Sequence, residues 1–67
     1  MQRIPVVSTN VSSIGYANGV IEVEFTDGSI YQYFGTNEYI FRNFLNAPSK
    51  GRFIHNYLKG YNYQRVA

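Results

Sequence analysis

The chain has 67 residues, including seven tyrosines and five phenylalanines but no cysteine, and its net charge is +2. This length predicts a single domain over residues 1–67 whose packing relies on aromatic side chains, because so short a chain buries only about 60% of its unfolded surface. The absence of cysteine excludes disulfides and thiolate metal sites, and no segment approaches the roughly 20 apolar residues of a membrane span. We therefore expect a cytoplasmic protein with no membrane partner.

Two turn signals follow residues 1–10, which we expect to form an extended N-terminal segment. Asn18-Gly19 and Asp27-Gly28 are each flanked by alternating apolar and polar residues. Such pairs favour type I′ turns, since these turns need positive φ at both central positions. If both loops contain two residues, the predicted pairs are Tyr16 with Ile21, Ile14 with Val23, Ser12 with Phe25, Phe25 with Ile30, Val23 with Gln32, and Ile21 with Phe34.

These pairs divide the side chains between the two faces of a three-stranded antiparallel meander. The predicted core face collects Ile14, Tyr16, Ile21, Val23, Phe25, Ile30 and Phe34. The opposite face collects Ser13, Gly15, Glu22, Glu24, Tyr31 and Tyr33, with each tyrosine paired across the strands with a glutamate.

The apolar period changes after Gly35 and predicts two helices. Ile40, Phe41, Phe44 and Leu45 have helical spacing, with Thr36 as the expected N-cap and Pro48 as the stop. Ser49 is the expected cap of a second helix, in which Phe53, Ile54, Tyr57 and Leu58 repeat the spacing before Gly60. The predicted class is therefore α+β, a three-stranded antiparallel β-meander followed by two α-helices packed on one sheet face. Residues 61–67 are expected to form either a further strand or an extended tail.

No group of side chains predicts catalysis. Glu22 and Glu24 lie two apart on a strand, but an outward sheet face lacks the enclosure that raises the pKa of one carboxyl in a hydrolase. The lone His55 has no cysteine or second histidine with which to bind a metal. We expect a non-catalytic protein without metal, cofactor or small-molecule substrate.

The second half of the chain is basic and free of acids. Residues 39–67 carry five Lys or Arg residues and no Asp or Glu. Helical spacing gathers Arg52, His55, Asn56 and Lys59 into one polar stripe, and Lys50 at the helix start can add a phosphate contact. Two interpretations remain open, an ordinary solvent-facing surface and a surface that binds phosphates and bases.

An ordered set of motifs resembles one small family. Ile14-Gly15-Tyr16, Val23-Glu24-Phe25, Asp27-Gly28, Tyr31-Gln32-Tyr33, Ala47-Pro48-Ser49-Lys50-Gly51 and the Tyr61 region together resemble the KTSC domain over residues 11–65. That family is named for the C-terminal segment of some lysyl-tRNA synthetases, also occurs as small bacterial and phage proteins, and is marked by its central Tyr-x-Tyr. Here Thr36-Asn37 replaces the usual Val-Pro, and His55 stands near a usual Asn.

The resemblance implies a binding module with RNA, and tRNA in particular, as its leading partner. The alternative is a module for protein interaction or homo-oligomerisation through exposed aromatic surface. Tyr31 and Tyr33 are either core anchors or a stacking platform, but their predicted neighbours Glu22 and Glu24 would repel phosphate. We therefore place the expected nucleic-acid surface on the second helix, at Lys50, Arg52, His55, Asn56 and Lys59.

Overall fold

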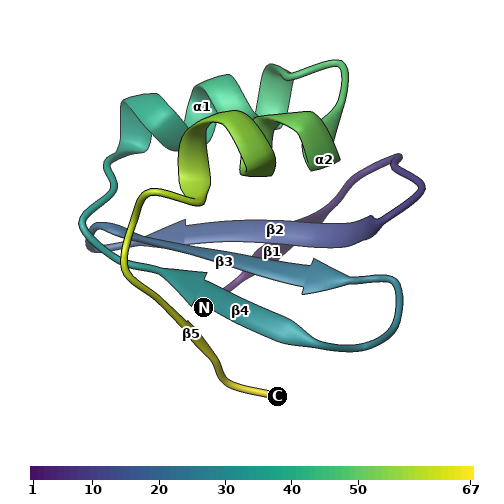
Figure 1. Ribbon diagram of the computed structural model, residues 1–67, viewed down its shortest axis with the longest axis horizontal. Helices are drawn as coiled ribbons and strands as arrows, with labels where there is room; N and C mark the ends of the chain where they lie inside the picture. The colour runs from purple at the N-terminus through teal and green to yellow at the C-terminus, as the bar shows by residue number, and fades with distance from the viewer.

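The computed structural model describes residues 1–67 and contains one five-stranded antiparallel sheet with a helix pair on one face (Figure 1). The strands lie in chain order across the sheet, as β1 (Arg3–Pro5), β2 (Val11–Ala17), β3 (Val20–Phe25), β4 (Ile30–Tyr33) and β5 (Tyr63–Arg65). The helices are α1 (Glu38–Asn46) and α2 (Lys50–Phe53), which continues into a π-helical turn, η1 (Ile54–Leu58). The predicted α+β class is confirmed.

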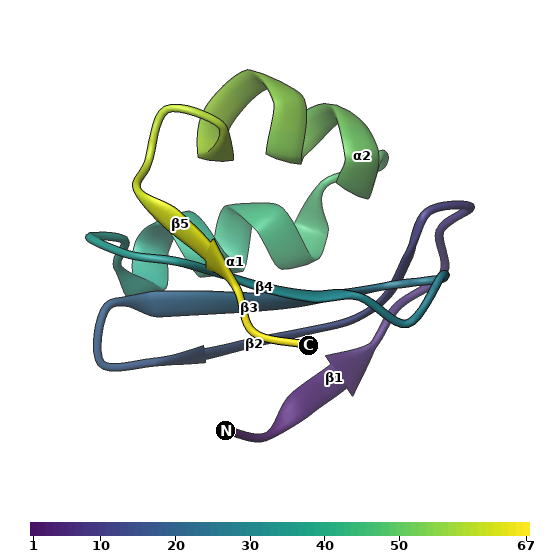
Figure 2. The ribbon, with the colours of Figure 1, turned by 60° about the horizontal axis from the view of Figure 1, so that its bottom comes forward.

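The sheet has two more strands than predicted. The N-terminal segment supplies β1, which pairs with β2 so that Arg3 lies opposite Gly15, and the tail supplies β5, with Tyr63 opposite Tyr33. An edge strand presents unpaired N–H and C=O groups. Here β1 pairs with those of β2, and β5 pairs with those of β4. Figure 2 shows α1 and α2 on one side of the resulting sheet.

The first hairpin has the predicted turn and register. Asn18 and Gly19 both have positive φ, at 50° and 80°, and they join Ala17 and Val20 in a two-residue loop. Tyr16 lies opposite Ile21 as expected. This geometry is the type I′ turn that an Asn-Gly pair favours.

The second hairpin differs from the prediction by one residue. The N–H of Phe25 donates to the carbonyl of Ser29 at 2.8 Å, and Gly28 has φ of 91°, so three residues form the loop instead of two. The carboxylate of Asp27 helps to close this longer loop by accepting from both the N–H and the hydroxyl of Ser29, at 2.9 and 2.6 Å. Ile30 therefore lies opposite Glu24 and not opposite Phe25.

This shift reverses the faces of β4, because successive side chains of a strand point to opposite sides. Tyr31 lies opposite Val23 and Tyr33 opposite Ile21, which places both tyrosines on the core face. The predicted positions of Ile30 and Phe34 on that face are wrong. So is the predicted pairing of each tyrosine with a glutamate, since Gln32 lies opposite Glu22.

A bulge in β2 makes one further predicted pair wrong. Val11 lies opposite Phe25 and Ser13 opposite Glu24, so that Ser12 has no partner of its own and the predicted pair of Ser12 with Phe25 does not form. A bulge changes the alternation of side chains along one strand. Val11 is thereby turned into the core, where it is buried.

The first helix begins one residue later than its predicted cap. Asn37 is the N-cap, and its side-chain oxygen accepts from the N–H of Ile40 at 2.9 Å. Thr36 is instead buried, and its hydroxyl and N–H both donate to the carbonyl of Gly19, at 2.7 and 2.9 Å. The predicted cap therefore ties the helix start to the first hairpin turn.

The core lies between the helix pair and the centre of the sheet. Its buried apolar residues are Val11, Ile14, Ile21, Val23, Tyr33, Phe44, Phe53 and Leu58. The rings of Phe44 and Phe53 stack across the two helices with centroids 5.0 Å apart. Phe25 and Leu45, which the sequence also places in the core, pack against its border and are half-buried.

Candidate functional site

Four of the five predicted site residues are exposed on the second helical segment. Arg52, His55, Asn56 and Lys59 all present their side chains to solvent. Lys50 does not join them, because it is buried and its amine donates to the carbonyl of Ala47 at 2.5 Å. That bond satisfies a carbonyl at the end of α1, so Lys50 holds the connection between the helices.

The π-helical turn divides the predicted stripe into two pairs. The N–H of Lys59 donates to the carbonyl of Ile54, five residues earlier, at 3.0 Å. A turn of this kind holds about one residue more than an α-helical turn, so residues four apart point nearly the same way. Arg52 and Asn56 therefore form one pair, and His55 and Lys59 form a second pair on a neighbouring side.

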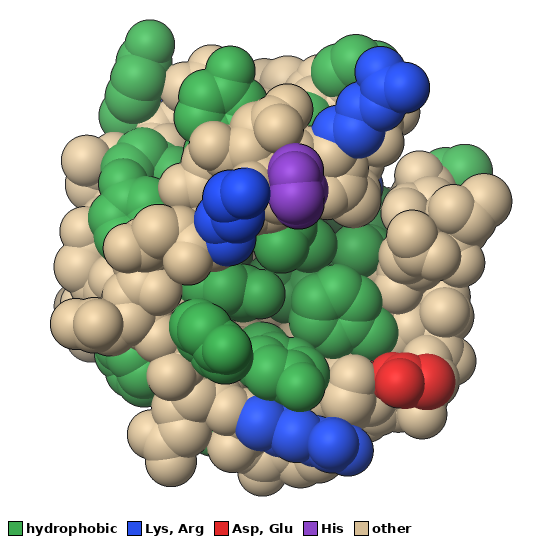
Figure 3. All heavy atoms as spheres, viewed as in Figure 1, with side chains coloured by type: hydrophobic (Ala, Val, Ile, Leu, Met, Phe, Trp, Pro, Cys, Tyr) green, Lys and Arg blue, Asp and Glu red, His purple; other side chains and the backbone are tan.

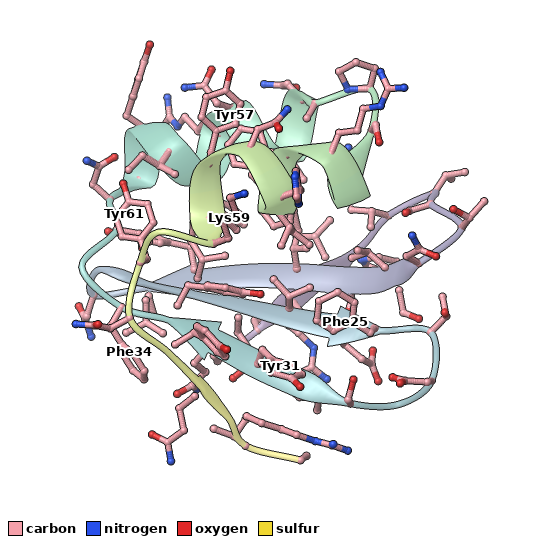
Figure 4. All side chains as sticks on the ribbon, viewed as in Figure 1. Phe25, Tyr31, Phe34, Tyr57, Lys59 and Tyr61 are labelled. Atoms are coloured by element: carbon pink, nitrogen blue, oxygen red, sulfur yellow. The ribbon has the colours of Figure 1, made fainter.

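The first pair borders a groove between the helices. A cleft of about 290 Å³ includes Arg52 and Asn56, and it adjoins a cleft of about 510 Å³ that reaches Tyr39. The two share Ala47, Pro48, Phe53 and Tyr57, and we call them together the interhelical groove. Tyr39 and Tyr57 are 75% and 63% exposed. Figure 4 shows Tyr57 on the side of the helix remote from the sheet.

The second pair lies on the face shown in Figure 3, where the single histidine is purple. Lys59 lies nearer to the sheet than Tyr57, and Phe25 and Tyr31 lie below it on the same face (Figure 4). Arg52, Lys59 and Arg65 take part in none of the ion pairs, whereas Arg42 pairs with Glu38 at 2.5 Å. Arg52 and Lys59 are therefore free to meet an anionic ligand, whereas the Nε of Arg65 already donates to the carbonyl oxygen of Ala67 at 2.8 Å and leaves only its other guanidinium nitrogens available.

A row of four aromatic rings runs across β3, β4 and β5. Phe25 and Tyr31 are 5.6 Å apart between centroids, Tyr31 and Tyr63 are 6.0 Å apart, and Tyr33 and Tyr63 are 5.8 Å apart. We call these four residues the aromatic row. Burial raises the pKa of Tyr33 above its ordinary value of 10.0, and the neighbouring Tyr31 and Tyr63 act in the same direction. The Tyr33 hydroxyl is therefore neutral at physiological pH.

Sequence reasoning assigned no role to Tyr63 or Arg65. Both belong to β5, where Tyr63 lies opposite Tyr33 and Arg65 opposite Tyr31. The alternation of Tyr61, Tyr63 and Arg65 with polar residues was the available signal for a strand. A strand of three residues is too short for such a pattern to identify, however.

Two of the acidic residues, Glu22 and Glu24, lie on the opposite face of the sheet with Arg3 of β1. Arg3 forms a hydrogen-bonded ion pair with Glu22, and its Nε donates to Ser13, whose hydroxyl donates to Glu24 at 2.9 Å. Burial raises the pKa of Glu22, but hydrogen bonds from Gln32 and Arg3 and the charge of Arg3 outweigh it, so this pKa lies below 4.5. Glu22 is therefore ionised at physiological pH and acts as a structural anchor.

No three His, Cys, Asp or Glu side chains gather where they could hold a metal ion. Neither helix has the length and apolar character that crossing a membrane requires.

Comparisons with known proteins agree on one family. The KTSC domain family matches residues 7–63. A lysine–tRNA ligase from Nostoc is 38% identical over 48 residues, and one from Trichormus variabilis is 35% identical. Each match covers 70% of this chain but only 9% of the ligase.

Two further relatives match almost end to end. An uncharacterized protein from Stutzerimonas stutzeri is 30% identical over 96% of this chain and 93% of its own length. The crystal structure of a KTSC domain protein from Yersinia pestis has a TM-score of 0.92 and 39% identity, and the match covers 98% of this chain and 97% of that one. The sequence match, the fold and the Tyr31-Gln32-Tyr33 motif lead to the same conclusion: this chain belongs to the KTSC domain family.

Proposed function

We propose that this KTSC domain is a non-catalytic module that binds single-stranded RNA through its second helical segment. One observation carries the proposal: Arg52 and Lys59 are exposed cations without acidic partners, on a segment that also presents Asn56 and Tyr57. Cationic side chains bind phosphates, an amide can bind a base edge, and an exposed aromatic ring can stack an unpaired base. These are the groups that RNA recognition outside a duplex uses.

We propose tRNA as the first RNA to test. The support is the similarity to segments of two proteins named lysine–tRNA ligase. Each match covers only 9% of the ligase, so the similarity gives no reason to propose the catalytic activity of those enzymes for this chain. Single-stranded regions of a tRNA, such as its loops and its 3′ end, suit a surface with cations and accessible rings.

The second candidate is a module for protein interaction or self-association. The interhelical groove favours it, because five of the seven residues that line its larger cleft are hydrophobic and two of these are the exposed Tyr39 and Tyr57. Aromatic residues are enriched where proteins meet. A molecular mass that rises with protein concentration would support this candidate, whereas steep salt dependence of binding would support RNA.

The charge contacts can be tested by replacing Arg52 and Lys59 together with alanine. We expect weaker binding to every RNA sequence and a salt slope lower by about one to two units, because two phosphate contacts no longer release counterions. The measurement is fluorescence anisotropy of labelled tRNA and of a single-stranded oligonucleotide over a series of salt concentrations.

Arg52→Ala and Arg42→Ala form a matched comparison within this test. Both remove one arginine from an exposed helical position, but Arg42 is already paired with Glu38. Arg42→Ala should therefore leave affinity and slope closer to the wild type than Arg52→Ala does. Equal affinities of the wild type and the double variant at low salt would refute the proposed surface.

A further inference from the structure

Three rings of the aromatic row, those of Phe25, Tyr31 and Tyr63, lie on a part of the core face that the helices leave uncovered, whereas Tyr33 is buried beside them. Ile14, Ile21 and Val23 in the middle of the sheet are fully buried beneath the helix pair. Towards β5 the burial falls, since Phe25 and Tyr31 are half-buried and Tyr63 is 60% exposed. Figure 3 shows the consequence, a band of hydrophobic surface across the middle of the molecule.

The register of β4 keeps carboxylates away from this band. Glu22 and Glu24 point to the other face, where Arg3 binds both of them. Asp27 is the acid beside the band, and its carboxylate accepts hydrogen bonds from Ser29 and is near enough to Arg65 for that charge to lower its pKa. Glu22 and Glu24 were expected to repel phosphate as neighbours of the tyrosines. Because they lie on the other face, that repulsion is absent from the face that carries the rings.

Cations border the band on two sides. Arg65 lies opposite Tyr31 on β5 and so shares its face, while Lys59 lies above the sheet at the end of the second helical segment (Figure 4). Figure 3 shows Lys and Arg side chains above and below the hydrophobic band. Aromatic rings between cations are the arrangement that binds the bases and phosphates of a single strand.

We infer that the accessible rings of the aromatic row, Phe25, Tyr31 and Tyr63, form a stacking surface for unpaired bases of RNA, with Lys59 and Arg65 holding the adjacent phosphates. This inference rests on the proposed function and extends the binding surface from the second helix across the sheet. The cations that border the band favour RNA over an apolar protein segment. Each nucleotide of RNA brings a base that can stack on a ring and a phosphate that can bind a cation. Tyr63 is the principal stacking residue, since its ring is the most exposed of the row.

Two probes of equal length separate stacking from charge. One is an oligouridylate, and the other is an abasic ribose phosphate chain that carries the same phosphates but no bases. We expect the wild type to bind the oligouridylate more tightly. Tyr63→Ala should weaken binding of the oligouridylate by roughly 5- to 100-fold with an unchanged salt slope, because a base contact is lost and no phosphate contact is. Binding of the abasic chain should stay the same.

Two further variants guard against loss of the fold. Tyr63→Phe keeps the ring and should bind the oligouridylate like the wild type. Tyr31→Leu keeps an apolar side chain at a half-buried position but removes the ring, so it should weaken oligouridylate binding while retaining the melting transition.

The inference and the proposed function fail in different ways. If Tyr63→Ala and Tyr31→Leu bind the oligouridylate like the wild type while the Arg52 and Lys59 double variant lowers the salt slope, the stacking surface is refuted and RNA binding stands. If the wild type binds neither probe nor tRNA, both are refuted. Concentration-dependent dimerisation that Tyr63→Ala abolishes would assign the aromatic row to a contact between copies of the chain and would also refute the inference.

Discussion

Gly19 serves the fold through its backbone alone. It holds φ of 80° in the first hairpin turn, and its carbonyl accepts both hydrogen bonds from Thr36. Residues other than glycine rarely adopt this backbone conformation, and a β-branched residue does so at a large energetic cost. One residue thus fixes the turn and positions the start of α1.

Gly19→Val should lower the free energy of unfolding by about 1–3 kcal/mol, because valine disfavours positive φ. Its Cβ would also lie 3.4 Å from the carbonyl oxygen of Thr36. Thermal or urea unfolding measures the effect. Gly60→Val is the control, since nothing lies within 4 Å of a Cβ built there, and its change should stay within about 0.5 kcal/mol. Equal melting temperatures for the two variants would argue against the strained turn.

Glu22 makes stability depend on acid pH. Because its pKa in the folded protein lies below the ordinary value of 4.5, the folded state favours the charged form. The resulting stabilisation is complete above the unfolded pKa and is lost as the pH falls through the lowered folded pKa. Stability should therefore decline below about pH 4.5 in part because the contacts of Glu22 with Arg3 and Gln32 weaken.

Glu22→Gln should destabilise the protein at neutral pH by about 1–3 kcal/mol, since hydrogen bonds to a charged group are lost. The difference from the wild type should shrink as the pH falls towards about 3, where the wild-type carboxyl also becomes neutral. Urea unfolding at both pH values tests this. Glu38→Gln, at an exposed carboxylate, should change stability little at either pH. A difference for Glu22→Gln that does not vary with pH would show that its charge is not responsible.

At the scale of elements, β1 packs on β2 only because residue 15 has no side chain. A Cβ built on Gly15 would lie 2.7 Å from the carbonyl oxygen of Gln2, closer than real Cβ contacts occur. The N-terminal segment therefore passes directly over this glycine. The same approach brings Arg3 within reach of Glu22.

Gly15→Ala should force β1 away from β2 and lower stability by about 1–3 kcal/mol, as overpacking does. Amide hydrogen exchange should become faster in β1, while the turn between β2 and β3 should keep its protection. Gly51→Ala provides the comparison: its Cβ meets only the side chain of Asn10, at 3.4 Å, and alanine favours a helix. Gly51→Ala should be neutral or stabilising. Unchanged exchange in β1 of the Gly15 variant would contradict the close approach.

The π-helical turn is the element that most changes the candidate site. Apolar spacing correctly predicts a helix over these residues, yet it assumes 3.6 residues per turn throughout. The turn over Ile54–Leu58 leaves Phe53 and Leu58 in the core but exposes Tyr57. It also separates Arg52 and Asn56 from His55 and Lys59. Single π-turns are frequently found at functional sites, which agrees with the role proposed for this segment.

At the scale of the whole molecule, the two faces of the sheet carry different groups of charged residues. The face under β1 holds Glu22 and Glu24 with Arg3, whereas the helix-bearing face carries Lys59 and Arg65 beside the aromatic row. A 67-residue chain has only two short helical segments with which to cover five strands. The strands nearest the C-terminus are therefore left with accessible rings. The proposed RNA surface is this uncovered part together with the second helical segment.

The sequence by itself determined the features that depend on local chemistry. The Asn18-Gly19 turn, the cap at Ser49, the end of α1 before Pro48 and the α+β class all follow from residues a few positions apart. So does the exposure of Arg52 and Lys59, since a charged side chain is costly to bury without a partner. Local signals of this kind also sufficed for the family resemblance.

Only the tertiary structure decided the faces and the neighbours. Loop length in the second hairpin depends on a hydrogen bond from Phe25 to Ser29, and one added residue moved Tyr31 and Tyr33 to the core face. The partners of Thr36, Lys50 and Tyr63 likewise depend on packing. Those of Thr36 and Tyr63 come from distant parts of the chain. Side-chain alternation has a period of two, so a local error of one residue reverses a whole strand. The aromatic row exists for that reason, because its rings are brought together by strand pairing between residues distant in the chain.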